Sequence, residues 1–73
     1  MQKVLLGIKR LVETDEWKVT VMIDGVYQEG PSAYTTDVND AIGALGLTAQ
    51  GYTDMGYEVS ITKGARSLME RNM

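Results

Sequence analysis

The stretch of residues 17–25 constrains the fold of this chain more than any other part of the sequence. Apolar residues recur there at every second position, which is typical of a strand with one buried face. Asp24-Gly25 ends the stretch, and both residue types tolerate the positive φ angles of a two-residue hairpin turn. We therefore expect a strand that turns directly into a shorter strand over residues 26–29. The buried side of the longer strand should carry Trp17, Val19, Val21 and Ile23.

Residues 3–12 fit both a helical stripe and an alternating strand. If residues 13–16 form a hairpin loop, Val12 lies opposite Trp17 and Ile8 lies opposite Val21, so the apolar faces of two strands coincide. A helix would also carry Gly7 in its middle, at a cost of about 1 kcal/mol relative to alanine. The sequence therefore predicts a strand over residues 3–12, antiparallel to the strand that starts at Trp17.

A helix is predicted after the hydroxyl-rich connection of residues 32–36. Residues 35–37 are all suitable N-caps, and Gly51 is expected to end the helix. Its apolar side should carry Val38, Ala41, Ile42, Leu45, Ala49 and Tyr52.

Two glycines, Gly43 and Gly46, weaken the interior of this helix. They leave two interpretations open. In one, the small residues let the helix lie close to the sheet. In the other, the helix has a flexible or contact-making surface around Gly43, Ala44 and Leu47.

The last part of the chain predicts one more strand and a short tail. Residues 57–62 alternate apolar and polar side chains, as a strand does, and Gly64 ends the run. The tail, residues 63–73, is shorter than an isolated helix needs to be stable, so it must dock on the domain or fray. A short helix there would carry Ala65, Leu68, Met69 and Met73 on one side.

These elements predict a single small α+β domain over residues 1–73, with a four-stranded, mostly antiparallel sheet and one helix packed on one face. A right-handed crossover through the helix gives the strand order 3-2-1-4, with the last strand parallel to the first. The β-β-β-α-β order resembles that of the partial ribonuclease-H-like domain of HicB-type antitoxins. This resemblance lies in element order alone and implies no function. The expected core is Leu6, Ile8, Val12, Trp17, Val19, Val21, Ile23, Val38, Ile42, Leu45, Val59 and Ile61.

The composition excludes most catalytic chemistry. The chain has no cysteine and no histidine, so it lacks thiolates, the commonest acid-base group and the commonest metal ligand. Its hydroxyl residues have no histidine to activate them, its glycines form no phosphate-binding loop, and its acidic residues lack the spacing of a calcium loop. We therefore expect no enzyme, no cofactor and no metal site.

Charge and hydropathy predict a cytoplasmic protein with an acidic body. The net charge is −3, and residues 13–61 contain nine acidic residues but only one lysine, whereas both ends are basic. An acidic body argues against a nucleic-acid-binding surface spread over the whole domain. No run approaches the ~18 apolar residues of a membrane helix, and Lys9-Arg10 interrupts the first apolar run too early for a signal sequence.

One face of the predicted sheet has no helix to cover it. It mixes lysines with more apolar surface than a small monomer commonly exposes. Two interpretations remain open: the tail folds back over this face through Leu68 and Met69, or a second subunit or target protein covers it. The residues expected to bind a partner here are Leu5, Leu11, Met22 and Tyr27.

The predicted topology also gathers acidic residues at the end of the sheet where the first strand finishes. Such a group can imitate nucleic acid phosphates toward a basic protein, or it can pair with the arginines of the tail. The acidic residues expected there as partner-binding candidates are Glu13, Asp15, Glu16, Asp37 and Asp40.

These features predict a non-catalytic protein-interaction protein that forms a homodimer or binds a protein target. Its size and acidity suggest an accessory or inhibitory protein of a phage or mobile element. Two other classes remain open. An enzyme subunit would complete the active site of another protein, and a nucleic-acid-binding module would use the sheet face with Lys3, Lys9, Lys18 and Tyr27.

Overall fold

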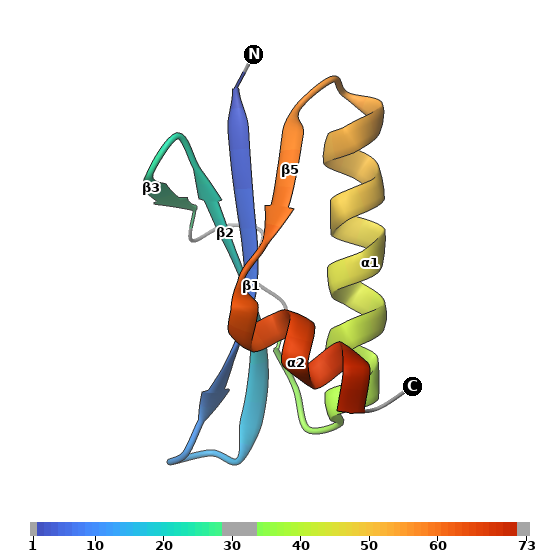
Figure 1. The fold of residues 1–73 in the computed structure, drawn as a ribbon. Helices are drawn as coiled ribbons and strands as arrows, with labels where there is room; N and C mark the ends of the chain where they lie inside the picture. Colours follow the sequence, from blue (N-terminus) through green and yellow to red (C-terminus); the bar gives the residue numbers. More distant parts are fainter. Residues whose placement is uncertain (1, 29–33, 72–73) are drawn as a thin grey trace.

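The computed structural model describes residues 2–28 and 34–71, which form an α+β fold with one mixed sheet and two helices (Figure 1). The elements are β1 (Lys3–Leu11), β2 (Glu16–Ile23), β3 (Val26–Gln28), β4 (Tyr34–Thr35), α1 (Val38–Asp54), β5 (Glu58–Ile61) and α2 (Lys63–Arg71). The sheet order is β3-β2-β1-β5, and β4 pairs with β2 on the same edge as β3. β5 is parallel to β1 and the other pairs are antiparallel. The predicted strand order and the parallel last strand are confirmed.

The hairpin of β1 and β2 has the predicted faces but not the predicted register. The sequence predicts Val12 opposite Trp17, whereas Arg10 lies there and the turn spans residues 12–15. Because the pairing moves by an even number of residues, every side chain keeps its face. Asp15 has a φ of 55°, a left-handed conformation that aspartate tolerates better than glutamate, so the turn closes on Asp15 rather than on Glu16. Val12 consequently leaves the core and is 83% exposed.

The second turn is the predicted one. Asp24 and Gly25 both have positive φ, at 49° and 83°, and the register that they set between β2 and β3 is the register expected from a two-residue turn. β3 ends at Gln28. Glu29, the first residues of the predicted connection and Met73 lie outside the described residues.

β4 is not predicted by the sequence. Tyr34 pairs with Lys18 and Thr35 pairs with Trp17. A strand of this length gives no periodic signal that could distinguish it from a loop. The pairing places the Tyr34 side chain on the same face of the sheet as Lys18.

α1 begins after Asp37, whose side chain accepts a hydrogen bond of 2.8 Å from a backbone N–H of the first turn. The predicted end at Gly51 is wrong, because the helix continues to Asp54. A glycine inside a helix costs only about 1 kcal/mol, and the packing of Tyr52 against the core favours the extra turn. The helix ends just before Gly56, whose φ is 92°.

The glycines of α1 face away from the sheet. A β-carbon at Gly43, Gly46 or Gly51 would meet no atom within 4 Å. Leu47, on the same helix, is 78% exposed. The interpretation that these glycines let the helix lie close to the sheet is therefore wrong.

Both helices pack on the same face of the sheet (Figure 1). α2 docks through Ala65, which is fully buried in one cluster with Leu6 and Leu45, and Met69 packs against that cluster. The interpretation that the tail covers the opposite face is therefore wrong. Within the described part of the chain, the buried core consists of Val4, Leu6, Val19, Val21, Ala41, Leu45 and Ala65.

Four more of the predicted core residues pack half-buried against this cluster, namely Ile8, Ile23, Val59 and Ile61. Neither helix of the described chain combines the length and apolar character that crossing a membrane requires.

Candidate interaction surface on the open sheet face

The face of the sheet opposite the helices, which we call the open face, is ordered in rows. Residues that pair across strands lie on the same side of a sheet, so the observed register fixes which side chains are neighbours. The apolar row holds Ser60, Leu5, Met22 and Tyr27; the hydroxyl row holds Thr62, Gly7 and Thr20; and the basic row holds Lys9, Lys18 and Tyr34. Beyond them lie two end rows, one with Glu58 and Lys3 and the other with Leu11 and Glu16. Asp24, in the β2–β3 turn, lies at the edge of the first end row, where its carboxylate accepts a 3.0 Å hydrogen bond from the Lys3 backbone N–H.

The apolar row brings three of the predicted partner-binding residues together. Leu5 is 38% exposed, Tyr27 is 60% exposed, and Met22 between them is half-buried. Leu11 lies on the same face but in an end row, apart from the other three. The row therefore forms a continuous apolar strip across three strands.

The basic row combines two like charges with an aromatic ring. Lys9 and Lys18 lie directly opposite each other on neighbouring strands, an arrangement that is destabilising unless other groups compensate it. The Lys18 ammonium lies 5.6 Å from the ring centroid of Tyr34, within the range of a cation–π interaction. Among the described residues, neither lysine has a carboxylate within ion-pair distance.

The hydroxyl row fills the centre of the open face. A β-carbon at Gly7 would lie 2.8 Å from the Thr20 Oγ1 atom and 3.2 Å from the Thr62 side chain. The two threonine side chains therefore occupy the space above Gly7, and the centre of the face is flat rather than hollow.

The predicted acidic residues do not share one role. The turn of the β1–β2 hairpin and the start of α1 lie at the same end of the molecule (Figure 1). Asp15 forms a 2.7 Å ion pair with Arg10, Asp37 caps α1, and Glu16 lies in an end row of the open face. Glu13 and Asp40 are exposed. Across residues 2–28 and 34–71, no three carboxylates come close enough together to hold a metal ion.

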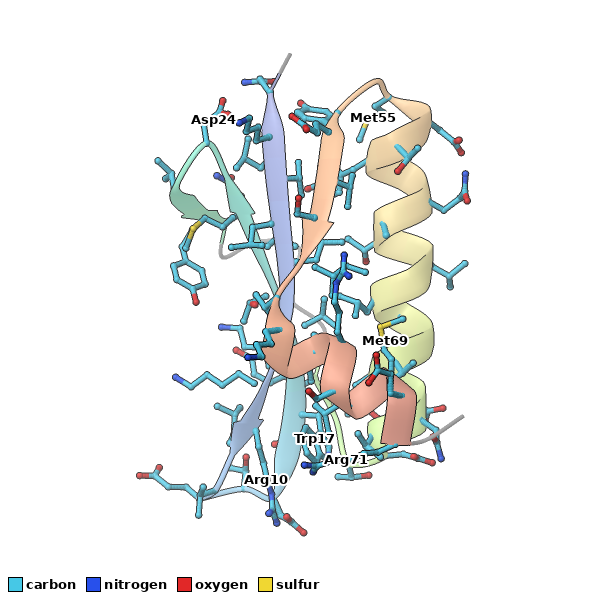
Figure 2. The ribbon with its side chains drawn as sticks, in the orientation of Figure 1. Arg10, Trp17, Asp24, Met55, Met69 and Arg71 are labelled. Atoms are coloured by element: carbon cyan, nitrogen blue, oxygen red, sulfur yellow. The ribbon has the colours of Figure 1, made fainter. Side chains whose placement is uncertain are left out.

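Arg10 fixes the end of the hairpin. Its guanidinium carbon lies 5.8 Å from the ring centroid of Trp17, and both side chains point to the helix side near the hairpin turn (Figure 2). With the ion pair to Asp15, these contacts join both strands to the turn. Both charged side chains are more than half exposed, so the ion pair contributes less than about 1 kcal/mol.

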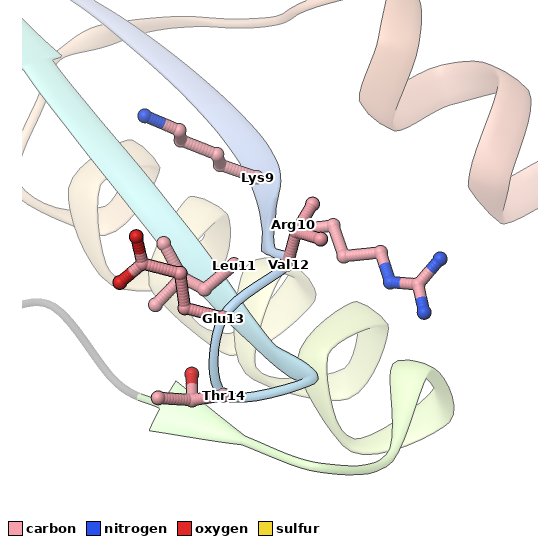
Figure 3. A pocket seen from close by; sticks show the side chains of 6 residues that line it. All are labelled: Lys9, Arg10, Leu11, Val12, Glu13 and Thr14. Atoms are coloured by element: carbon pink, nitrogen blue, oxygen red, sulfur yellow. The ribbon is translucent and has the colours of Figure 1, made fainter.

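A surface hollow of about 390 Å³ lies where β1 runs into this turn (Figure 3). The sequence does not predict this hollow, because a bend of consecutive residues forms it and no pattern of separated residues marks it. The lining residues are Lys9, Arg10, Leu11, Val12, Glu13 and Thr14.

Comparison with known proteins gives no match for this chain among family models, curated proteins or solved structures.

Proposed function

We propose that this chain is a non-catalytic protein-interaction protein that associates with a second copy of itself through the open face. The observation that carries the proposal is the position of both helices on one side of the sheet. That arrangement leaves the strip of Leu5, Met22 and Tyr27 without a cover among the described residues. An apolar strip on an open sheet face is typical of an interaction surface.

The small core supports self-association. Among residues 2–28 and 34–71, seven apolar side chains are buried, two of them alanines, in a chain of a length at which burial only just outweighs chain entropy. Covering the open face with another copy would remove further apolar surface from water, at about 25 cal/mol for each Å².

The charge of the open face also fits a second copy. The whole chain carries −3, but the described residues of the face carry charges of both signs, so two copies can meet there without the repulsion of two acidic surfaces. Its positive residues are Lys3, Lys9 and Lys18, its negative residues are Glu16 and Glu58, and the Asp24 carboxylate lies at its edge on the Lys3 backbone N–H.

The size of the face fits a small, weak dimer interface. With a rise of about 3.3 Å per residue and strands about 4.8 Å apart, its projected area is roughly 450 Å². Two such faces together fall just below the ~1,000 Å² expected of a specific protein interface, so we expect a weak dimer whose formation depends on concentration.

Light scattering after size-exclusion chromatography, over a range of concentrations, tests the proposal. We expect the wild-type mass to rise toward that of a dimer, and we expect Leu5→Lys and Met22→Lys to remain monomeric with unchanged circular dichroism spectra. Leu47→Lys is the matched control, because Leu47 is as apolar and 78% exposed but lies on α1, away from the open face. A wild type that stays monomeric at every concentration would overturn the proposal, as would a control variant that dissociates equally.

A second candidate function is binding of single-stranded nucleic acid on the same face. β4 favours it, because it adds Tyr34 beside Lys18, so the open face carries two exposed tyrosines, Tyr27 and Tyr34. Their partners on β2 are four residues apart, or about 13 Å along the strand. Bases can stack on such rings while lysines contact phosphates.

Fluorescence anisotropy with a labelled single-stranded oligonucleotide separates the two functions. Nucleic acid binding predicts an affinity that falls steeply with salt and that Tyr34→Ala and Lys18→Gln each weaken. The dimer proposal predicts no binding at physiological salt. Tight, salt-dependent binding by a wild-type monomer would replace our first proposal with the second.

A further inference from the structure

We infer that the two copies stack with their β1 strands antiparallel, so that the two β1–β2 turns lie at opposite ends of the dimer. This inference rests on the proposed self-association through the open face. It adds the orientation of the partner, which the rows of the open face determine.

Two orientations are available to a symmetric face-to-face stack. The twofold axis of an isologous dimer must lie between the sheets, and in an aligned stack, the arrangement that we infer here, the strands of the two sheets keep within about 30° of each other. The axis therefore runs either along the strands or across them. An axis along the strands keeps every row at its own level, whereas an axis across the strands reverses the order of the rows.

An axis along the strands is unfavourable because it places the basic row on itself. Lys9 of one protomer would face Lys18 of the partner subunit, and four ammonium groups would meet in one contact that excludes water. Like charges that face each other are destabilising even between strands of one sheet. Burial without an opposite charge raises that cost.

An axis across the strands reduces this conflict, because the basic row then faces a row that contains carboxylates. If it passes between the apolar row and the hydroxyl row, the basic row of one protomer faces the partner's end row that contains two carboxylates. Because each strand then lies over its own copy, Lys18 falls opposite Asp24 of the partner subunit. Lys9 falls opposite the partner's Lys3. That lysine lies between the two carboxylates: Glu58 pairs with it on β5, and Asp24 accepts a hydrogen bond from the Lys3 backbone N–H.

The same position of the axis also allows the side chains of the two open faces to pack closely against each other. It lays the bulky side chains of the apolar row over the small side chains of the partner's hydroxyl row. Large residues over small ones interdigitate at the ~10 Å spacing of stacked sheets. Charge and volume therefore favour the same antiparallel arrangement.

Pulsed electron paramagnetic resonance on a spin-labelled Thr14→Cys variant tests the orientation. The chain contains no cysteine, so the introduced thiol is the one labelled site, and Thr14 lies in the exposed β1–β2 turn, away from the expected contact. The antiparallel stack predicts a label-to-label distance of about 45 Å, and the parallel stack predicts roughly 10–20 Å. A short distance in a sample that light scattering identifies as dimeric would overturn the orientation and leave the proposed self-association intact.

The variant Lys18→Gln gives an independent readout, because Lys18 faces a carboxylate of the partner in the antiparallel stack and Lys9 of the partner subunit in the parallel stack. In the antiparallel stack it removes an attraction, so we expect the dissociation constant of the dimer to rise about tenfold. In the parallel stack it would remove a repulsion and lower that constant. A tighter dimer would therefore overturn the inference, and a wild-type monomer in both experiments would overturn the inference together with the proposed function.

Discussion

Gly7 on β1 lies directly across from Thr20 on β2, and the Thr20 side chain fills the place that a β-carbon on Gly7 would need. The distance from that β-carbon position to the Thr20 Oγ1 atom is 2.8 Å, shorter than a real contact allows. Threonine is branched at its β-carbon and stiff at χ1, so it cannot simply turn away. A glycine is therefore required at this position by close packing on the open face.

We predict that Gly7→Ala lowers the free energy of unfolding by about 1 kcal/mol, because overpacking costs more than the loss of glycine flexibility gains. Urea denaturation measures this change. The double variant Gly7→Ala/Thr20→Ala should lose less stability than the sum of the two single variants, because Thr20→Ala removes the close contact. Additive effects would show that the contact does not limit position 7.

The faces of the sheet could be predicted from the sequence, but the register of the hairpin could not. Alternation along β1 and β2 determines which side chains are buried, and an even shift leaves that unchanged. The register depends instead on the backbone conformation of one turn residue, Asp15, for which alternation carries no signal. The face on which α2 docks could not be predicted from the sequence either, because docking depends on the fit of the small Ala65 side chain into an assembled core.

The candidate surface depends on that register. The predicted pairing would place Leu5 opposite Asp24 and Lys9 opposite Thr20, and neither the apolar row nor the basic row would exist. The observed pairing puts Leu5 opposite Met22 and Lys9 opposite Lys18. The residues of the open face were therefore predictable, but their grouping was not.

Asp15 offers a direct test of why the turn spans residues 12–15. Both Asp15→Ala and Asp15→Gly remove the ion pair with Arg10, but only glycine accepts a φ of 55° without strain. We predict that Asp15→Ala lowers the unfolding free energy by about 1–2 kcal/mol and that Asp15→Gly changes it by less than about 0.5 kcal/mol. Thermal denaturation of the two variants measures the difference. Equal losses would assign the stability of the turn to the ion pair instead.

Replacement by alanine should change the free energy of unfolding in opposite directions at two of the glycines. Gly46 lies inside α1 with open space around it, so Gly46→Ala should raise the unfolding free energy by about 0.5–1 kcal/mol. Gly25 has a φ of 83° in the β2–β3 turn, so Gly25→Ala should lower it by about 1–2 kcal/mol. Differential scanning calorimetry of both variants checks the prediction. A destabilised Gly46→Ala variant would indicate that this side of α1 is in contact with another surface.

The docking of α2 on the helix side of the sheet predicts a sharp contrast between two residues on different sides of this helix. Ala65 is completely buried in the core, whereas Ser67 on the same helix is exposed. Ala65→Glu would place a carboxylate in an apolar core without a partner, so we expect it to lower the unfolding free energy by at least about 3 kcal/mol. Ser67→Glu adds the same side chain at the surface and should change it by less than about 0.5 kcal/mol. Guanidinium denaturation compares the two. If both variants are equally stable, Ala65 is not in the core, and the tail again becomes a candidate to cover the open face.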